Sequence, residues 1–329
     1  MTYRYFADRD PLRRAVIDRM LSGVSTRKFA RVAEPVGSDV EATAGSKAKS
    51  SVSEMFIEQT RAELGELTAC RLDGTRLAVM MLDGLEIAGR VHVVGLGIST
   101  EGVKVSVGLW EGSIENATLA RELLADLARA RVGPDPGDSV RPGRRKGAEE
   151  AVRDVFGEHA LVQRCHRDKE RNVCDLLPER DRQTVLTRIR GAWALTDSAQ
   201  ALADLQTLAG ELERSWPDAP GSLREGIEET LTLMSLGIGG KLARTLSLTN
   251  PCESMIEVVR HTQRNVKRWQ DRDMRKRWTA AATLQAEQQL RRIIGYSDLT
   301  NPVITIEHRH LLLQSQNQAH TSARQPVTV

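Results

Sequence analysis

Two carboxylates have the type and placement to take part in chemistry in this chain. Asp83 ends an apolar run in the sequence MMLDG, and a carboxylate beside glycine at a strand end is well placed to bind a hard cation. Glu253 lies in TNPCESM, at the first turn of a helix that Asn250 and Pro251 are expected to start. Each also has an ordinary structural explanation, because acidic residues end many strands and favour helix N-termini.

A basic segment follows Glu253. Residues 251–295 contain ten basic and five acidic side chains. Four of the basic residues recur at helical spacing, so we expect them near one side of a helix, where they could hold a phosphate backbone. These four are Arg260, Arg264, Lys267 and Arg268. Trp269 could stack on a base, although a packed tryptophan is the commoner outcome.

The N-terminal part is helical in pattern. Residues 12–34 place apolar side chains at helical spacing around a turn at residues 23–25, a helix-turn-helix pattern. A further helical stretch begins at Ser46, and Lys47 and Lys49 near its start could meet phosphates. Two interpretations stay open: a DNA-binding region, and a solvated helical hairpin.

Apolar runs rich in Val and Ile follow at residues 77–83, 90–98 and 103–110. The short connections between them, at 84–89 and 99–102, predict an antiparallel meander. An amphipathic helix is expected after Asn116. Three strands followed by a helix are how a ribonuclease H-like fold begins.

A fourth strand, parallel to an earlier one, should come after that helix, but residues 133–147 contain three prolines and four glycines and cannot form a central strand. A helix at 148–157, a short strand at 160–164 and a basic helix from His166 are expected next. Residues 178–249 are almost wholly helical in pattern, with Trp193 and Trp216 as packing anchors. The polar tail is expected to be poorly ordered.

Composition narrows the class of protein. The chain has 329 residues, 40% of them apolar, and a formal net charge of only +3, so nucleic-acid binding must rest on local charge. The four cysteines show no CxxC pairing, which argues against a disulfide framework or a zinc ribbon. No apolar stretch is long enough to cross a bilayer and the first residues lack a signal-peptide pattern, so we expect a cytoplasmic protein with no membrane partner.

Three long segments resemble transposases of the Mutator family, in the order found in that family. They run from DGLEIAGRVHVVGLGIST to ENATLARELLADL, from AVRDVFGEHALVQRC to ERNV, and from SLTNPCESMIEVVRHTQRNVKRW to RRIIGYSDL. The resemblance covers most of residues 24–299. It implies a DDE-type enzyme with an α/β, ribonuclease H-like mixed sheet, a helical insertion and a small helical, helix-turn-helix-like region in front.

By this resemblance Asp83 is the first catalytic carboxylate and Glu253 the last, and together they bind Mg²⁺ or Mn²⁺. The implied domains are a DNA-binding-like region at 1–72, a catalytic domain at 73–299 with its insertion at about 178–249, and a tail at 300–329. The implied partners are double-stranded DNA with transposon terminal repeats and a second copy of the chain. The N-terminal region looks short for the family.

The chain departs from the family at two places. The middle aspartate of the family would fall at about Gly143, inside the segment rich in proline and glycine, and a compensated pair of frameshifts in the gene would explain this segment. Asp138 and Asp135 lie nearby, and Asp138 is the candidate substitute for the missing metal ligand. The second departure is at Cys165, because the family has histidine three residues after this cysteine and this chain has Asp168 there.

Three functions are therefore open. The first is a transposase whose strand transfer is impaired or lost with the second aspartate. The second is a catalytically inert DNA-binding relic, or an inhibitor of an intact transposase. The third, a residual metal-dependent nuclease that uses Asp138, is the least favoured because its surroundings oppose a rigid site.

Overall fold

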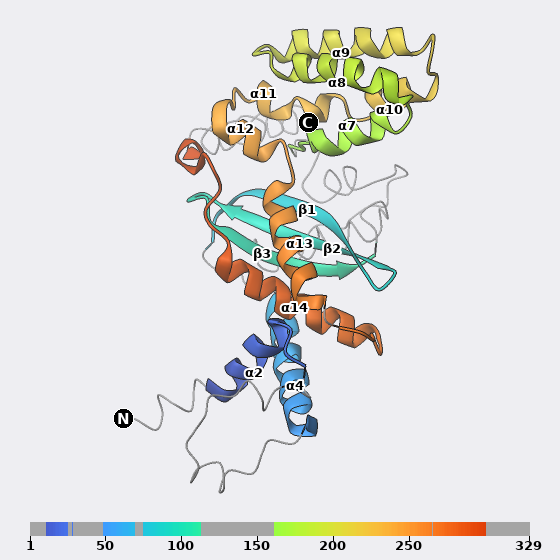
Figure 1. Ribbon diagram of the computed structural model, residues 1–329. Coiled ribbons are helices and arrows are strands. Elements are labelled where there is room, and N and C mark those ends of the chain that lie inside the picture. The colour runs from blue at the N-terminus through green and yellow to red at the C-terminus, as the bar shows by residue number, and fades with distance from the viewer. Residues whose placement is uncertain are drawn as a thin grey trace, which may run out of the picture.

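Three consecutive strands form an antiparallel sheet in the order β1-β2-β3. They are β1 (Leu77–Ile87), β2 (Arg90–Ser99) and β3 (Lys104–Glu111). The computed structural model describes residues 11–25, 28, 49–69, 75–112, 161–264 and 266–300. Within these residues the protein is a mixed α/β structure with helices at both ends of the sheet and across one face (Figure 1). The predicted meander is confirmed.

The first strand extends further than predicted. We expected it to end at Asp83 and a turn to span residues 84–89, but β1 continues to Ile87 and the turn is only Ala88 and Gly89, both at positive φ. Two residues of this kind form a tight hairpin whose twist suits the strands it joins. The strand continues because Leu85 and Ile87 alternate into the core. Asp83 is therefore an interior residue of β1.

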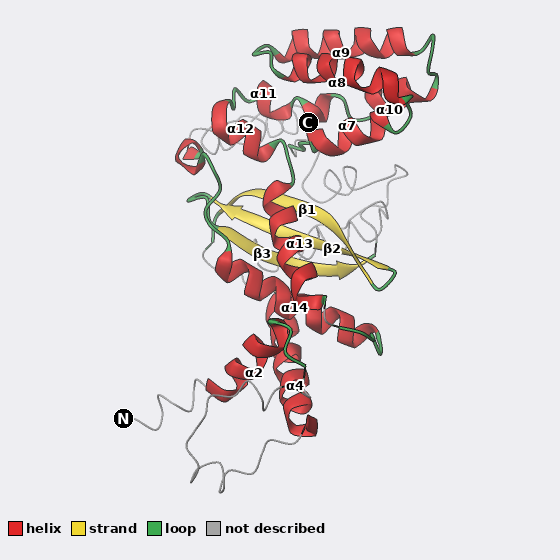
Figure 2. Cartoon of the chain, viewed as in Figure 1, coloured by secondary structure: helices red, strands yellow, loops and turns green. Residues whose placement is uncertain are grey.

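Two helices cover one face of the sheet, α13 (Asn250–Gln263) and α14 (Arg272–Gln289). Figure 2 shows α13 lying across the strands. Side chains of β1 and β2 that share one face form a core with α13: Met81, Leu85, Ile87, Val94, Leu96 and Ile98 pack with Cys252, Met255, Ile256 and Val259.

Of the N-terminal helices, α4 (Lys49–Thr68) packs on α14, and α2 (Pro11–Leu21) packs on α4. Their shared core joins Val16, Ile17, Met20, Leu21, Val52 and Phe56 to Trp278 and Ala281. The predicted turn after α2 is present, with Gly23 at φ 91°. Most of the second helix expected before residue 34 lies outside the described residues. The inner faces of α2 and α4 are thus used for packing.

Residues 166–246 form what we call the helical group, at the other end of the sheet (Figure 1). It comprises α7 (His166–Cys174), α8 (Glu179–Trp193), α9 (Ser198–Leu212), α10 (Asp218–Arg224), a 3-10 turn η2 (Glu228–Thr230), α11 (Thr232–Ser235) and α12 (Gly240–Leu246). Its helical character is as predicted, and Trp193 and Trp216 both pack on its core. That core includes Val173 and Leu177, so the packed unit begins with α7.

The short strand predicted at 160–164 is wrong for the described residues 161–164. These residues form an irregular connection that hydrogen-bonds to the helical group: the Arg164 N–H donates to the Glu229 carbonyl, and the Gln163 side chain bonds to Thr230 and Leu233. The Val162 carbonyl also accepts a hydrogen bond from the Thr232 hydroxyl, so backbone groups of this connection find partners in the helical group in place of a neighbouring strand. The helices predicted after Asn116 and at 148–157, the segment 133–147 and the tail from residue 301 lie outside the described residues. In the described part of the chain, no helix combines the length and apolar character needed to cross a membrane.

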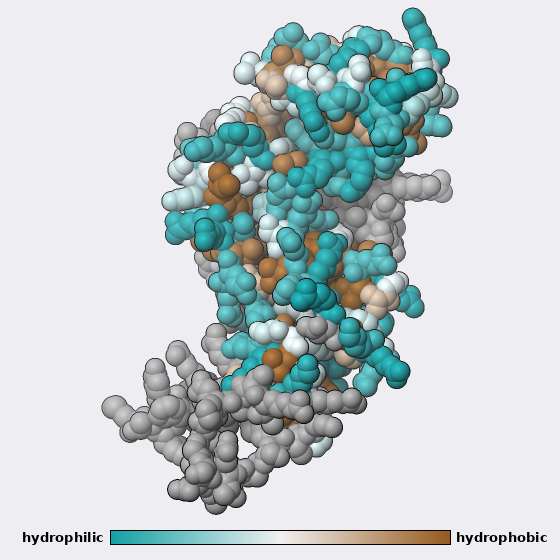
Figure 3. Space-filling model, viewed as in Figure 1, coloured by the Kyte–Doolittle hydropathy of each residue, from teal (hydrophilic) through white to brown (hydrophobic). Residues whose placement is uncertain are grey.

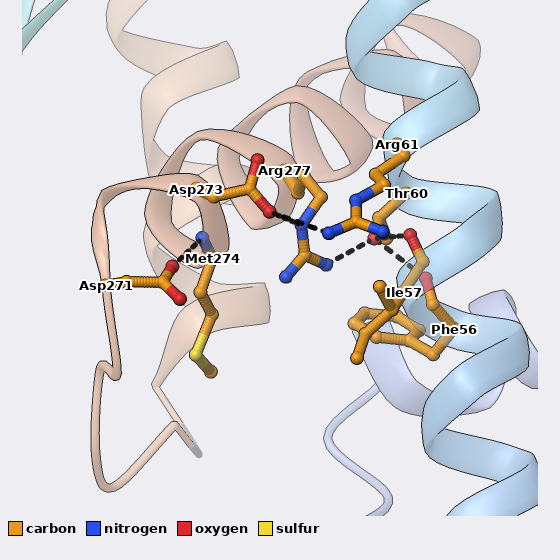
Figure 4. Close-up of polar contacts among 8 residues, drawn as sticks. All are labelled: Phe56, Ile57, Thr60, Arg61, Asp271, Asp273, Met274 and Arg277. Carbon is orange, nitrogen blue, oxygen red and sulfur yellow. Dashed lines mark hydrogen bonds and ion pairs between the residues drawn. The ribbon is translucent and has the colours of Figure 1, made fainter.

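A buried arginine joins α4 to α14. Arg277 donates from Nε to Asp273 (2.7 Å) and from Nη1 to the Thr60 hydroxyl (2.9 Å), and Thr60 in turn donates to the Phe56 carbonyl (Figure 4). Arg61 reaches the same Asp273 carboxylate at 3.7 Å, but its side chain is 66% exposed against 6% for Arg277. The two arginines therefore share one partner in very different surroundings.

Replacing Arg277 with Met should lower the free energy of unfolding by about 1–3 kcal/mol, because the substitution removes a charge-assisted contact from a buried interface. Arg61→Met is the matched control and should change it by no more than about 0.5 kcal/mol, since exposed ion pairs contribute little. Urea denaturation of both variants measures the difference. Equal effects would show that burial does not set the strength of these contacts.

Candidate active site

The start of α13 is fixed on the sheet by a buried cysteine. Pro251 lies in the first turn, where its missing N–H costs nothing, and it is buried together with Cys252. The Cys252 thiol is fully enclosed and its Sγ lies 3.8 Å from the Val94 carbonyl oxygen on β2. Since Glu253 is the next residue, its position follows from this contact.

Val94 also fixes the position of Asp83. Val94 is the register partner of Asp83 across the β1–β2 ladder. Side chains two residues apart on a strand share a face, so Asp83 lies on the same face as Met81 and Leu85, which α13 covers. The structure thus brings Asp83 and Glu253, 170 positions apart in sequence, to one end of α13.

The electrostatics of Asp83 agree with this placement. Its pKa is raised above the ordinary value, first because burial disfavours the charged form and then because of the negative charges of Asp168 and Glu253. Two effects oppose the rise: the Gly84 N–H donates to Oδ1 at 2.7 Å, and the positive charge of Arg260 stabilises the carboxylate. Asp83 is therefore a partly buried carboxyl group among like charges.

Both oxygens of Glu253 have hydrogen-bond donors. Arg167 Nη1 lies 3.0 Å from Oε2, and the Thr249 hydroxyl lies 3.5 Å from Oε1. Burial, followed by the charges of Asp83 and Glu253, raises the pKa of the Cys252 thiol, which is therefore neutral and acts as a packing group. The first turn of α13 thus directs the Glu253 carboxylate toward the site and buries the neighbouring Cys252.

Helix α7 contributes two residues that the sequence did not lead us to select. Arg167 contacts Glu253, and the negative charge of Asp168 raises the pKa of Asp83. Asp168 itself accepts a hydrogen bond from Arg171 at 2.6 Å. One signal was available, since Asp168 stands three residues after Cys165, where the Mutator pattern has histidine.

Cys165 lies next to this helix and is half-buried. Its Sγ is 3.7 Å from the Thr249 hydroxyl, and burial raises the pKa of its thiol above the ordinary value. His166 is stacked on Trp193, with ring centroids 3.8 Å apart, and its Nε2 contacts the Thr230 carbonyl. Within the described residues, no group of three or more His, Cys, Asp or Glu side chains is arranged to hold a metal ion.

The basic residues predicted to share one helical face do so only in part. Arg260 lies on α13, exposed and near Asp83, and Arg264 is the exposed C-cap residue of that helix. The prediction is wrong for Lys267 and Arg268, which lie in the irregular connection between α13 and α14, although both are exposed. The helix stops because the chain turns to let Val266 and Trp269 pack against the core of α2, α4 and α14.

Trp269 is half-buried and meets Trp278 edge to face, with centroids 6.4 Å apart, so it is a packing residue. Lys49 is the first residue of α4, but its side chain is not described, and Lys47 and Asp138 lie outside the described residues. Figure 3 shows that the described part of one face is mostly hydrophilic, with hydrophobic residues only in small groups.

Two comparisons with known proteins both point to transposases. The family model described as "Transposase, Mutator family" matches residues 2–292. A relative from Corynebacterium diphtheriae, described as a probable transposase for an insertion sequence element, is 26% identical over 190 residues, which cover 57% of this chain and 54% of the relative. The chain thus spans about half the length of this curated relative.

Replacing Asp83 with Asn should stabilise the metal-free protein at pH 8. Because the pKa of Asp83 is raised in the folded state, its carboxyl group contributes to stability at pH values below its ordinary pKa. This contribution is lost as the pH rises through the pKa of the folded state. Removing the charge should therefore gain about 0.3–1 kcal/mol at pH 8, a figure reduced for the partial exposure of the group, and nothing at pH 3.

Urea denaturation in EDTA at both pH values measures this gain. Glu86→Gln is the matched control, because Glu86 is an exposed carboxylate on the other face of the same strand. If Asp83→Asn were no more stable than Glu86→Gln at pH 8, the raised pKa of Asp83 would be contradicted.

Proposed function

The chain belongs to the Mutator family of transposases, and on that basis we propose that it acts on double-stranded DNA at the terminal repeats of an insertion sequence. The proposal extends to this chain what the name of the Corynebacterium relative says of that protein. We propose a DDE mechanism, in which metal-bound carboxylates support DNA cleavage and strand transfer, and we propose that strand transfer is impaired or lost in this chain because the second aspartate is missing.

The observation that carries the proposal is the convergence of Asp83 and Glu253 at the start of α13. The Cys252–Val94 contact and the Asp83–Val94 pairing bring the two carboxylates together. The negative charges of Asp83 and Glu253 both act on the Cys252 thiol. Two carboxylates brought together at one place suit Mg²⁺ or Mn²⁺, since hard divalent ions prefer oxygen ligands. The donor chemistry therefore fits such an ion.

Asp83 and Glu253 would hold the ion from two rigid elements, a strand and a helix. When bound, such ions lower the pKa of an attacking water or 3′-hydroxyl and stabilise the departing oxygen. The positive charges of Arg260, Arg264, Lys267 and Arg268 would bind the phosphate backbone beside the site, because they lie along α13 and the connection that follows it. From the family resemblance alone, we also propose that two copies of the chain pair two DNA ends.

A ribonuclease H-like fold is part of the proposal. It is supported by the three-stranded antiparallel meander, by the position of Asp83 on the first strand, and by a helix that carries Glu253 across the sheet. The helical group between β3 and α13 suits an insertion placed before the final carboxylate.

A second function is favoured by the composition of residues 133–147. Where the family's middle aspartate is expected, this chain has a segment rich in proline and glycine. A chain with only two of three metal-binding carboxylates would keep its basic surface but lose strand transfer. We therefore retain, as the alternative, an inert DNA-binding protein that occupies transposon ends or inhibits an intact transposase.

The test is Mg²⁺- or Mn²⁺-dependent cleavage of DNA that carries the terminal repeats flanking the gene. The natural chain is compared with a variant in which residues 133–147 are replaced by a strand ending in Asp-Gly. We expect cleavage by the replaced chain only, and a loss on the order of a thousand-fold or more when Asp83→Asn or Glu253→Gln is added to it, because a bound metal contributes several kcal/mol.

Other outcomes separate the alternatives. Cleavage by the natural chain that is lost in Asp138→Ala would assign the missing ligand to Asp138. Binding of both chains to the repeats without cleavage would leave the inert DNA-binding function. Cleavage that is indifferent to Asp83 and Glu253 would reject the proposed metal site.

A further inference from the structure

Arg167 forms an ion pair with Glu253, the carboxylate that the proposed mechanism requires for a metal ion. Its Nη1 is 3.0 Å from Glu253 Oε2, and the side chains of Arg167 and Glu253 are 54% and 41% exposed. The other oxygen of Glu253 accepts from the Thr249 hydroxyl at 3.5 Å. In this arrangement the guanidinium neutralises the carboxylate from the side of the helical group.

A divalent ion and this guanidinium compete for the same group. Both are positive and both bind the Glu253 carboxylate, so repulsion between them favours displacement of Arg167 when Glu253 binds an ion. The displacement is easy, because an exposed ion pair contributes no more than about 1 kcal/mol. Arg167 is thus a removable counter-ion for Glu253.

The displaced guanidinium would remain near the site because α7 is firmly attached. Lys169, on the same helix, is buried and donates from Nζ to the Ser222 carbonyl at 2.7 Å and to the Glu225 carbonyl. The His166 N–H donates to the Ser247 carbonyl, two residues before Thr249. These contacts tie α7 to α10 on one side and to the segment leading into α13 on the other.

A guanidinium held in this position is suited to a phosphodiester. Its five N–H donors match phosphate oxygens in a bidentate arrangement, and it stays charged at all relevant pH values. We propose that Arg167 exchanges partners: it binds Glu253 in the metal-free protein and binds the DNA phosphate at the site when a divalent ion takes Glu253. This inference rests on the proposed function and adds to it a phosphate-binding residue from the helical group.

The first measurement is Mn²⁺ binding, by calorimetry, to the full chain and to Arg167→Ala. Removing the competitor should tighten Mn²⁺ binding about two- to five-fold, as expected for loss of an exposed ion pair. Arg188→Ala is the matched control, because Arg188 forms a comparably exposed pair with Glu211 inside the helical group, away from the site. It should leave Mn²⁺ binding unchanged.

The second measurement is binding of a short DNA duplex in Ca²⁺, over a range of salt concentrations. Arg167→Ala should weaken binding several-fold and reduce the slope of log K against log salt by about one, the value for one lost phosphate contact. Arg167→Lys should keep the slope, since it keeps the charge, but bind less tightly. Unchanged or weaker Mn²⁺ binding in Arg167→Ala, or an unchanged salt slope, would overturn the exchange.

Glu253→Gln distinguishes this inference from the proposed function. If the natural chain binds Mn²⁺ no better than Glu253→Gln, the metal site is wrong and the exchange fails with it. If Mn²⁺ binding depends on Glu253 but not on Arg167, the metal site stands and only the exchange is rejected.

Discussion

The candidate site depends on the burial of the first turn of α13 against the β1–β2 ladder. Cys252 is enclosed against Val94, and Val94 is paired with Asp83, so one packing contact positions a carboxylate from a helix beside one from a strand. Close packing permits little adjustment, and a larger residue at Cys252 would move Glu253 away from Asp83. The buried thiol, which has no chemical role, is thus the residue that sets the geometry.

This arrangement costs stability. Burial and the charges of Asp168 and Glu253 raise the pKa of Asp83, so its ionised form is disfavoured in the folded protein. A protein under selection for stability alone would have a neutral residue here. The surrounding cations reduce the cost, because Arg260 acts on Asp83 and Arg167 binds Glu253 directly. Strain of this kind is typical of sites that bind a cation or a substrate.

Local patterns in the sequence predicted the elements well and their ends less well. The runs rich in Val and Ile and the short connections between them predicted the meander, and Pro251 predicted the start of α13, because these signals act over a few residues. The extension of β1 past Asp83 was missed since glycine suggested a turn, whereas Leu85 and Ile87 are held by contacts with α13. Similarly, basic residues at helical spacing suggested a longer α13, but tertiary packing of Trp269 ends it.

Arg167 could not be found from spacing, because its role depends on how α7 is held against the rest of the chain. A buried lysine is costly unless its donors are satisfied, and Lys169 is satisfied by carbonyls near the end of α10. His166, between Trp193 and the Thr230 carbonyl, adds a second contact that fixes α7 within the helical group. The same helix turn that carries these anchors carries Arg167 and Asp168 toward the carboxylates. A displacement of the helical group would therefore move charges at the site, so the helical group and the electrostatics of Asp83 and Glu253 are coupled through α7.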